Sequence, residues 1–177
     1  MIKRLTKYLY ILLFFIPGFS EAQTHDLKFT TVTGENGVFL GKINDITQDR
    51  NGTIWFSDQT NRGITKYDGT RMTRYQNDSR KTNSLGGIYP ECLFADSSGI
   101  IWIGFYGYGL DRFDPENNIF THFRHDPNDS QSIANDTVTA VLIDHLNNVW
   151  VATYGGLDLL DPATGKFSHF AHEFATF

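Results

Sequence analysis

Residues 90–105 read PECLFADSSGIIWIGF, an apolar run, a polar turn and a second apolar run that contains a tryptophan. The same arrangement occurs twice more, as INDITQDRNGTIWFSD over residues 43–58 and as VTAVLIDHLNNVWVAT over residues 138–153. The tryptophans of the three copies, 47 and 48 residues apart, are Trp55, Trp102 and Trp150. The chain is therefore built from a structural repeat.

Each copy carries the same turn ahead of its tryptophan. Six positions before the tryptophans stand the aspartates Asp49, Asp96 and Asp144. Three positions before them stand residues suited to left-handed backbone, namely Gly52, Gly99 and Asn147. We assign structural roles to all of these positions: the aspartates accept backbone hydrogen bonds within their turns, and the tryptophans pack between neighbouring repeats.

Two further blocks complete each copy, a glycine followed by an apolar strand that ends in aspartate, and a pair of apolar residues three positions apart. Alternation and turn residues together predict four short strands per copy, A to D in chain order. A period of this length is typical of β-propeller blades. We predict an all-β protein of about three four-stranded antiparallel blades from an incomplete propeller. The expected divisions are residues 1–22 (signal peptide), 23–42 (outer strand and linker), 43–87 (first blade), 88–137 (second blade) and 138–177 (third blade and tail).

The N-terminus has the pattern of a secretory signal. Three basic residues precede the apolar run 8–19, and the small residues Ser20 and Ala22 predict cleavage after residue 22. An uncleaved anchor is the alternative. Cleavage changes the balance of basic to acidic residues from 15 against 20 to 12 against 19. This acidic chain without a Lys/Arg cluster argues against nucleic acid as a partner. The single cysteine, Cys92, is expected to be buried and inert.

The repeats support a family comparison over residues 26–170. The order of Asp-x-x-Gly-x-x-Trp-Ile-Gly, a glycine–leucine pair, an aromatic-Asp-Pro and the linker HDPNDSQSIAN at residues 125–135 resembles the two-component regulator propeller repeat. That repeat builds the periplasmic sensor region of Bacteroidetes-type hybrid histidine kinases. The resemblance implies a seven-bladed, dimeric parent protein anchored in the inner membrane. We interpret the chain as a truncated N-terminal part of such a sensor that lacks blades; the alternative is a natural three-blade protein that associates with itself.

Strand order indicates where a ligand would bind. The B–C loops and D–A linkers of up-and-down blades share one face, and they are the longer and more variable connections here. Aromatic, amide and guanidinium groups suit the apolar face and hydroxyl rim of a sugar. We therefore predict an oligosaccharide site, with no catalytic residue, cofactor or metal, at Gln59, Asn61, Arg62, Phe105, Tyr106, Tyr108 and Tyr154. The alternative is that the tyrosines only pack between blades.

The predicted function is non-catalytic sensing of an oligosaccharide in the periplasm. The rival is a fragment of a propeller enzyme of lyase or lactonase type, because the first copy loosely resembles the streptogramin lyase repeat. In the A strands only Asp45 and Glu91 could then serve at the central channel. Histidines recur in the outer strands as the pairs His122 with His125 and His169 with His172. We interpret them as a surface feature rather than a metal site.

Overall fold

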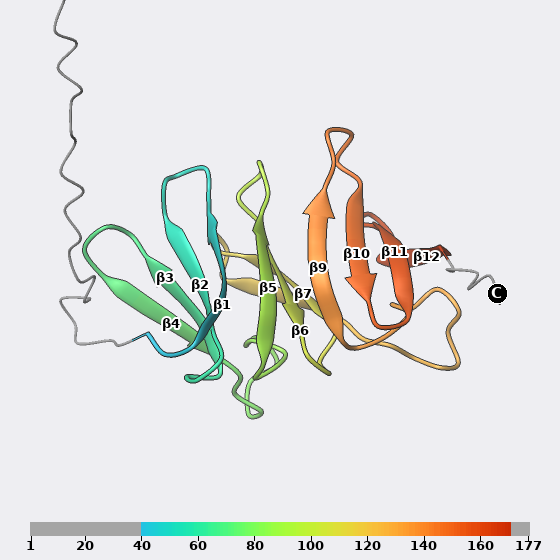
Figure 1. Ribbon diagram of the computed structural model, residues 1–177, viewed down its shortest axis with the longest axis horizontal. Helices are drawn as coiled ribbons and strands as arrows, with labels where there is room; N and C mark the ends of the chain where they lie inside the picture. The colour runs from blue at the N-terminus through green and yellow to red at the C-terminus, as the bar shows by residue number, and fades with distance from the viewer. Residues whose placement is uncertain (1–39, 171–177) are drawn as a thin grey trace, which may run out of the picture. The chain divides into compact units, whose positions relative to one another are not determined.

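The computed structural model describes residues 40–170, which form three antiparallel four-stranded sheets without a helix (Figure 1). The first sheet consists of β1 (Ile43–Gln48), β2 (Ile54–Asp58), β3 (Gly63–Tyr67) and β4 (Met72–Gln76). The second consists of β5 (Pro90–Ala95), β6 (Ile101–Phe105), β7 (Leu110–Asp114) and β8 (Ile119–Phe123). The third consists of β9 (Val138–Ile143), β10 (Val149–Thr153), β11 (Gly156–Asp161) and β12 (Lys166–Phe170). The predicted all-β class and propeller blades are confirmed.

The turn between the first two strands of each sheet has the predicted backbone. Gly52, Gly99 and Asn147 have φ angles of 81°, 95° and 64°, in the left-handed region. The aspartate that opens each turn accepts two backbone N–H groups with one carboxylate oxygen, as Asp96 does from Ser98 at 2.8 Å and Ile100 at 3.0 Å. The tryptophans all lie on the second strand of their sheets, at equivalent positions.

The sheets pack face to face through two apolar clusters. Each sheet has a forward face, turned toward the next sheet in sequence, and a rear face, turned toward the preceding one. The first cluster joins the forward face of the first sheet (Trp55, Ile64) to the rear face of the second (Leu93, Ile101, Ile103, Phe113). The second joins the forward face of the second sheet (Trp102, Leu110) to the rear face of the third (Val141, Val149, Val151, Leu160). The innermost strands β1, β5 and β9 consequently lie side by side (Figure 1).

The long segments between sheets, which the sequence analysis placed on the ligand-binding face, also have a structural role. Residues 77–89 and 124–137 insert Leu85 and Ile133, both 0% exposed, into the two clusters. Each linker is also bonded to the sheet that follows it. A buried aspartate of that sheet accepts a linker N–H, from Gly86 to Asp111 Oδ2 at 2.6 Å and from Ala134 to Asp158 Oδ2 at 2.9 Å.

Other predictions fall on residues that are not described. The signal peptide and the outer strand expected near residues 27–32 lie outside residues 40–170, as does the tail after residue 170. Within residues 40–170, nothing forms a helix of the length and apolarity needed to cross a membrane.

Candidate functional site

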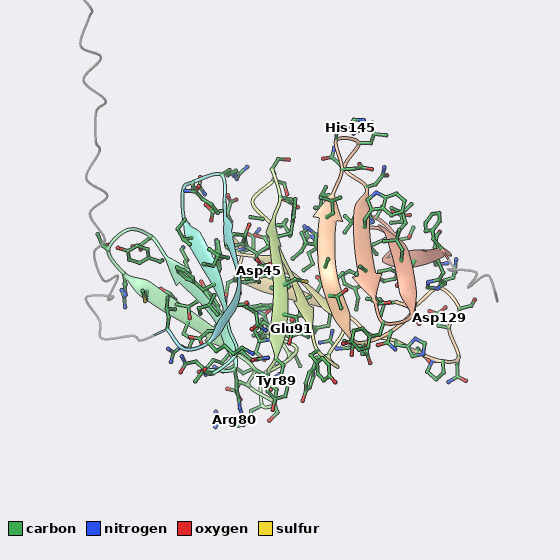
Figure 2. All side chains as sticks on the ribbon, viewed as in Figure 1. Asp45, Arg80, Tyr89, Glu91, Asp129 and His145 are labelled. Atoms are coloured by element: carbon green, nitrogen blue, oxygen red, sulfur yellow. The ribbon has the colours of Figure 1, made fainter. Side chains whose placement is uncertain are left out.

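The two ends of the sheets differ in their connections. Figure 2 shows His145 in a first turn at one end and Glu91, Tyr89 and Arg80 at the other, where the B–C loops and linkers meet. In every sheet the first loop residue after strand B donates its N–H to the residue just before strand A. These bonds, each 3.0 Å long, are Gln59 to Lys42, Tyr106 to Tyr89 and Tyr154 to Thr137. The loops therefore start from a fixed base, which is what a binding surface requires.

Tyr106 and Tyr154 form an exposed aromatic pair across two sheets. Tyr106 follows β6 and Tyr154 follows β10, and their ring centroids lie 6.4 Å apart at an interplanar angle of 90°. The residues are 53% and 70% exposed. The pair combines both sequence interpretations, because the rings contact each other between blades and still present apolar surface and hydroxyl groups to solvent.

Phe105 and Tyr108 do not share this exposure. Phe105 is the last residue of β6 and is 0% exposed inside the first cluster, so its ring is not accessible to a ligand. Adjacent strand residues point to opposite faces, and the accessible loop begins one residue later. Tyr108 is half-buried against the same cluster, with its ring centroid 6.3 Å from that of Tyr89.

Two of the three candidates of the first sheet, Gln59 and Asn61, form hydrogen bonds within the protein. Gln59 accepts a hydrogen bond from Lys42 Nζ at 2.9 Å and donates one to Glu91 Oε1 at 3.2 Å, so it joins the first two sheets. Asn61 donates to the buried Asp58 at 2.6 Å. Arg62 is exposed, with a left-handed φ of 54°. All three residues lie on a different sheet from the tyrosine pair, and the side chains of Gln59 and Asn61 are bonded within the protein.

The two carboxylates of the inner strands also join sheets. Asp45 Oδ2 accepts the backbone N–H of Leu93 at 2.7 Å, and Glu91 Oε2 accepts the side-chain amide of Asn44 at 2.9 Å (Figure 2). Cys92 directly follows Glu91 and is 7% exposed, so it is buried as predicted. Burial raises the pKa of the Cys92 thiol to about 12, with smaller contributions from these two carboxylates.

The outer-strand histidines have partners that the sequence analysis missed. His122 Nδ1 lies 2.8 Å from Asp111 Oδ1, and His169 Nδ1 lies 2.7 Å from Asp158 Oδ1. Both aspartates are fully buried and also hold a linker. The sequence contains one indication of this aspartate–histidine pairing, because the first copy lacks both residues. Thr65 stands there opposite Arg74, in the register that pairs aspartate with histidine in the other two copies. Over residues 40–170, no three His, Cys, Asp or Glu side chains are grouped to hold a metal ion.

A cavity of about 440 Å³ lies between the second and third sheets, at the end that carries the turns between the first two strands of each sheet and away from the B–C loops. Its wall includes Ser97, Arg112 and Pro162. At the equivalent place between the first two sheets, Arg50 bridges to Glu116 at 2.8 Å. Ser97, which carries no charge, occupies the position of Arg50 in the repeat. This hollow was not part of the predicted site.

No protein-family model matches the chain. The chain is similar to the extracellular domain of BT3049, described as a hybrid two-component system of B. thetaiotaomicron, at 30% identity and a TM-score of 0.68 over 75% of this chain and 19% of that one. It is also similar to virginiamycin B lyase from Staphylococcus aureus, at 18% identity and a TM-score of 0.54, covering 74% of this chain and 41% of the lyase. The lyase likeness shows the fold alone.

One curated relative supports the first comparison. Histidine kinase P4 of Formosa agariphila is 29% identical over 65 residues, which is 37% of this chain and 5% of the kinase. The chain therefore spans only a small part of the proteins from signalling systems that it matches. The structural likeness to an extracellular domain of a two-component system extends over three quarters of the chain.

Proposed function

We propose that this chain is a non-catalytic, extracellular segment of a two-component sensor that binds an oligosaccharide through Tyr106 and Tyr154. The sensor part of the proposal is supported by the likeness to the extracellular domain of BT3049 and to histidine kinase P4. The ligand part rests on one observation, the exposed tyrosine pair formed by B–C loops of neighbouring sheets.

The geometry of the pair favours a sugar over a fully apolar ligand. A pyranose offers a C–H face that can pack on one ring, and hydroxyl groups that can bond the phenol of the other. The two rings are perpendicular, so a single residue of sugar can contact one face and one edge. The fixed loop bases keep this arrangement in place without a ligand, which reduces the entropy lost on binding.

The complete protein would extend beyond this chain. We include in the proposal that residues 1–22 direct secretion to the periplasm and that the three blades belong to a larger, membrane-anchored propeller. The 30% sequence identity to the extracellular domain of BT3049, over 19% of that chain, supports this. N-terminal sequencing of secreted protein tests the signal: it should begin at Gln23, and a start at Met1 would contradict cleavage.

A propeller enzyme remains the rival function. It is supported only by the shared fold with virginiamycin B lyase. The inner-strand carboxylates Asp45 and Glu91 that it would need are bonded to Leu93, Asn44 and Gln59. A sensor would bind an oligosaccharide and release it unchanged, whereas an enzyme of this kind would convert its substrate, so chromatography of the recovered ligand distinguishes the two.

Binding of the protein to an array of neutral and uronic-acid oligosaccharides tests the ligand. We expect Tyr106→Ala and Tyr154→Ala each to weaken the positive signals by about tenfold, since an aromatic contact of this kind contributes on the order of 1 kcal/mol or more. Leu146→Ala is the matched control, because Leu146 is 68% exposed but lies in a first turn at the opposite end. Unchanged binding by both tyrosine variants, with the control also unchanged, would overturn the assigned site.

A further inference from the structure

The cavity of about 440 Å³ between the second and third sheets (the second gap) is enclosed by consecutive sheets of the chain. Its volume falls within the range of about 300–1,000 Å³ that is typical of small-molecule sites. The second sheet contributes Trp102 and Arg112 to the wall, and the third contributes Ile143 and Val149. An adjoining hollow of about 350 Å³ shares part of this wall and reaches His145, which is labelled in Figure 2. The second gap thus combines apolar surface with a guanidinium.

The matching gap between the first and second sheets (the first gap) is bridged by the protein itself. Arg50, in the first turn of the first sheet, forms an ion pair with Glu116 over 2.8 Å. Its guanidinium also lies beside the neighbouring turn, because a Cβ added to Gly99 would stand 3.3 Å from Arg50 Nε. Lys66 supplies a further cation, with its ammonium nitrogen 5.9 Å from the centre of the Trp55 ring. The first gap therefore has two cations on one sheet and a carboxylate on the other.

The second gap keeps one of these cations but has neither partner of the ion pair. Arg112 pairs with the tryptophan of its sheet in the strand register, as Lys66 does in the first sheet. Ser97 takes the position of the bridging arginine, and Ala163 takes that of its glutamate, two residues after the aspartate in both copies. Arg112 interacts electrostatically with Asp114 on its own sheet, but within residues 40–170 it forms no ion pair across the gap. Its guanidinium therefore lines the cavity without the facing carboxylate that the first gap provides.

The carboxylates at this end of the gap are already engaged. Asp96, in the cavity wall, and Asp144, in the adjoining hollow, each accept two backbone N–H groups with one oxygen and an indole N–H with the other. By contrast, Ser97 and Asn147 in the cavity wall offer a hydroxyl and an amide that can donate hydrogen bonds. Together with Arg112, these groups are complementary to a negatively charged ligand.

We propose that the second gap binds a small organic carboxylate. Arg112 pairs with the carboxylate through charge-assisted hydrogen bonds, and Ser97 donates a further one. The apolar part of the ligand packs against Trp102 and Val149. The ligand then connects the second sheet to the third, as the ion pair connects the first sheet to the second. This site is separate from the tyrosine pair and does not depend on oligosaccharide binding there.

NMR titration of the ¹⁵N-labelled full chain tests the site, with benzoate and hexanoate as probes and benzamide and hexanamide as their neutral counterparts. The indole N–H signals distinguish the places where a probe can bind. Trp102 lines the second gap, Trp55 is buried in the first cluster, and Trp150 lines an open apolar hollow on the third sheet. We expect both carboxylates to shift the Trp102 signal and to bind on the order of tenfold more tightly than the amides, which lack the charge.

Two variants examine the assigned groups. Arg112→Gln should weaken carboxylate binding on the order of tenfold and leave amide binding unchanged. Arg80→Gln is the matched control, because it removes the same charge at the opposite end (Figure 2). The double substitution Ser97→Arg with Ala163→Glu introduces the ion pair of the first gap and should abolish binding of acids and amides alike. Both replaced residues are exposed, so the fold should persist, as circular dichroism will verify.

Four results would overturn the inference. These are an unshifted Trp102 signal with both acids, equal affinity for acids and amides, unchanged acid binding by Arg112→Gln, and wild-type binding by the folded double variant. A response of Trp150 alone belongs to the first of these results, because the acids would then bind the apolar hollow on the third sheet. Failure of oligosaccharides to bind the tyrosine pair would leave all of these outcomes unaffected.

Discussion

The indole nitrogen of Trp55 donates a hydrogen bond to Asp49 Oδ2 over 2.9 Å. The other oxygen of this carboxylate accepts the backbone N–H groups of Asn51 and Thr53, at 2.9 and 3.1 Å. Equivalent aspartates bond Trp102 at 3.2 Å and Trp150 at 3.1 Å. A single side chain in each blade thus shapes the turn and orients the tryptophan, which in the first two blades packs on the next sheet.

Replacing this aspartate should destabilise the fold. We expect Asp49→Ala to lower the free energy of unfolding by about 1–3 kcal/mol, because the buried indole and two amides lose their acceptor. Asp49→Asn should cost less, since its one amide oxygen still serves part of the set. Urea unfolding followed by tryptophan fluorescence measures both. Equal stability of wild type and Asp49→Ala would contradict the role given to this carboxylate.

The turns illustrate how far a repeat predicts a fold. Gly52, Gly99 and Asn147 were assigned left-handed backbone from residue type and position, and all three have it. The hydrogen bond from indole to aspartate was not predicted, although the aspartate stands six residues before the tryptophan in all three copies. Local backbone geometry follows from local sequence, whereas a side-chain bond depends on the rotamers that packing selects.

Contacts between segments that are far apart in the sequence were harder to predict. The bond from Gly86 to Asp111 spans 25 residues and depends on the path of the linker over the following sheet. For the site, the sequence pattern placed aromatic residues near the B–C loops but could not determine at which residue the second strand ends. Phe105 therefore entered the candidate set although it is buried, while its neighbour Tyr106 is exposed.

Stability should depend on pH through His169. The hydrogen bond to Asp158 is the main cause that raises the pKa of His169 above its ordinary value of 6.5. A raised folded-state pKa contributes stability that is fully present below 6.5 and is lost as pH rises through the folded value. His169→Gln should therefore be destabilising at about pH 5.5 and much less so at about pH 8.5.

Urea midpoints at the two pH values provide the measurement for His169. His125→Gln is a suitable control, since His125 Nδ1 bonds the carbonyl oxygen of Ile133 rather than a carboxylate. A His169→Gln effect of the same size at both pH values would show that the bond does not favour the charged imidazole.

Cys92 should be unreactive in the folded protein. Its thiol is buried and its pKa is about 12, so almost no thiolate exists near neutral pH. We expect a thiol reagent to label the chain only in concentrated guanidinium. Because the chain has one cysteine, all labelling reports on this position. Rapid modification without denaturant would mean that the second and third inner strands, β5 and β9, separate readily.

The linker residue Ile133 should contribute as a core residue does. It is 0% exposed within the second cluster, and Ile133→Ala should cost about 2–5 kcal/mol through lost burial and a cavity. Leu146→Ala, at an exposed site, should stay within about 0.5 kcal/mol of wild type. Limited proteolysis should also become faster within residues 124–137. A linker that resisted cleavage in a destabilised Ile133→Ala protein would show that other contacts hold it.

The attachment of each linker to the sheet that follows it defines the unit that can be exchanged between proteins. Residues 77–89 are bonded to Asp111, and residues 124–137 to Asp158. A graft that moved only the strands of a blade would leave the buried carboxylate of Asp111 or Asp158 without the linker N–H that it accepts. It would also remove the buried linker side chain, Leu85 or Ile133, from the apolar cluster. When blades are transplanted, duplicated or deleted, the boundaries should therefore lie just after a fourth strand, as in residues 77–123 or 124–170. Each linker then stays with the sheet to which it is bonded.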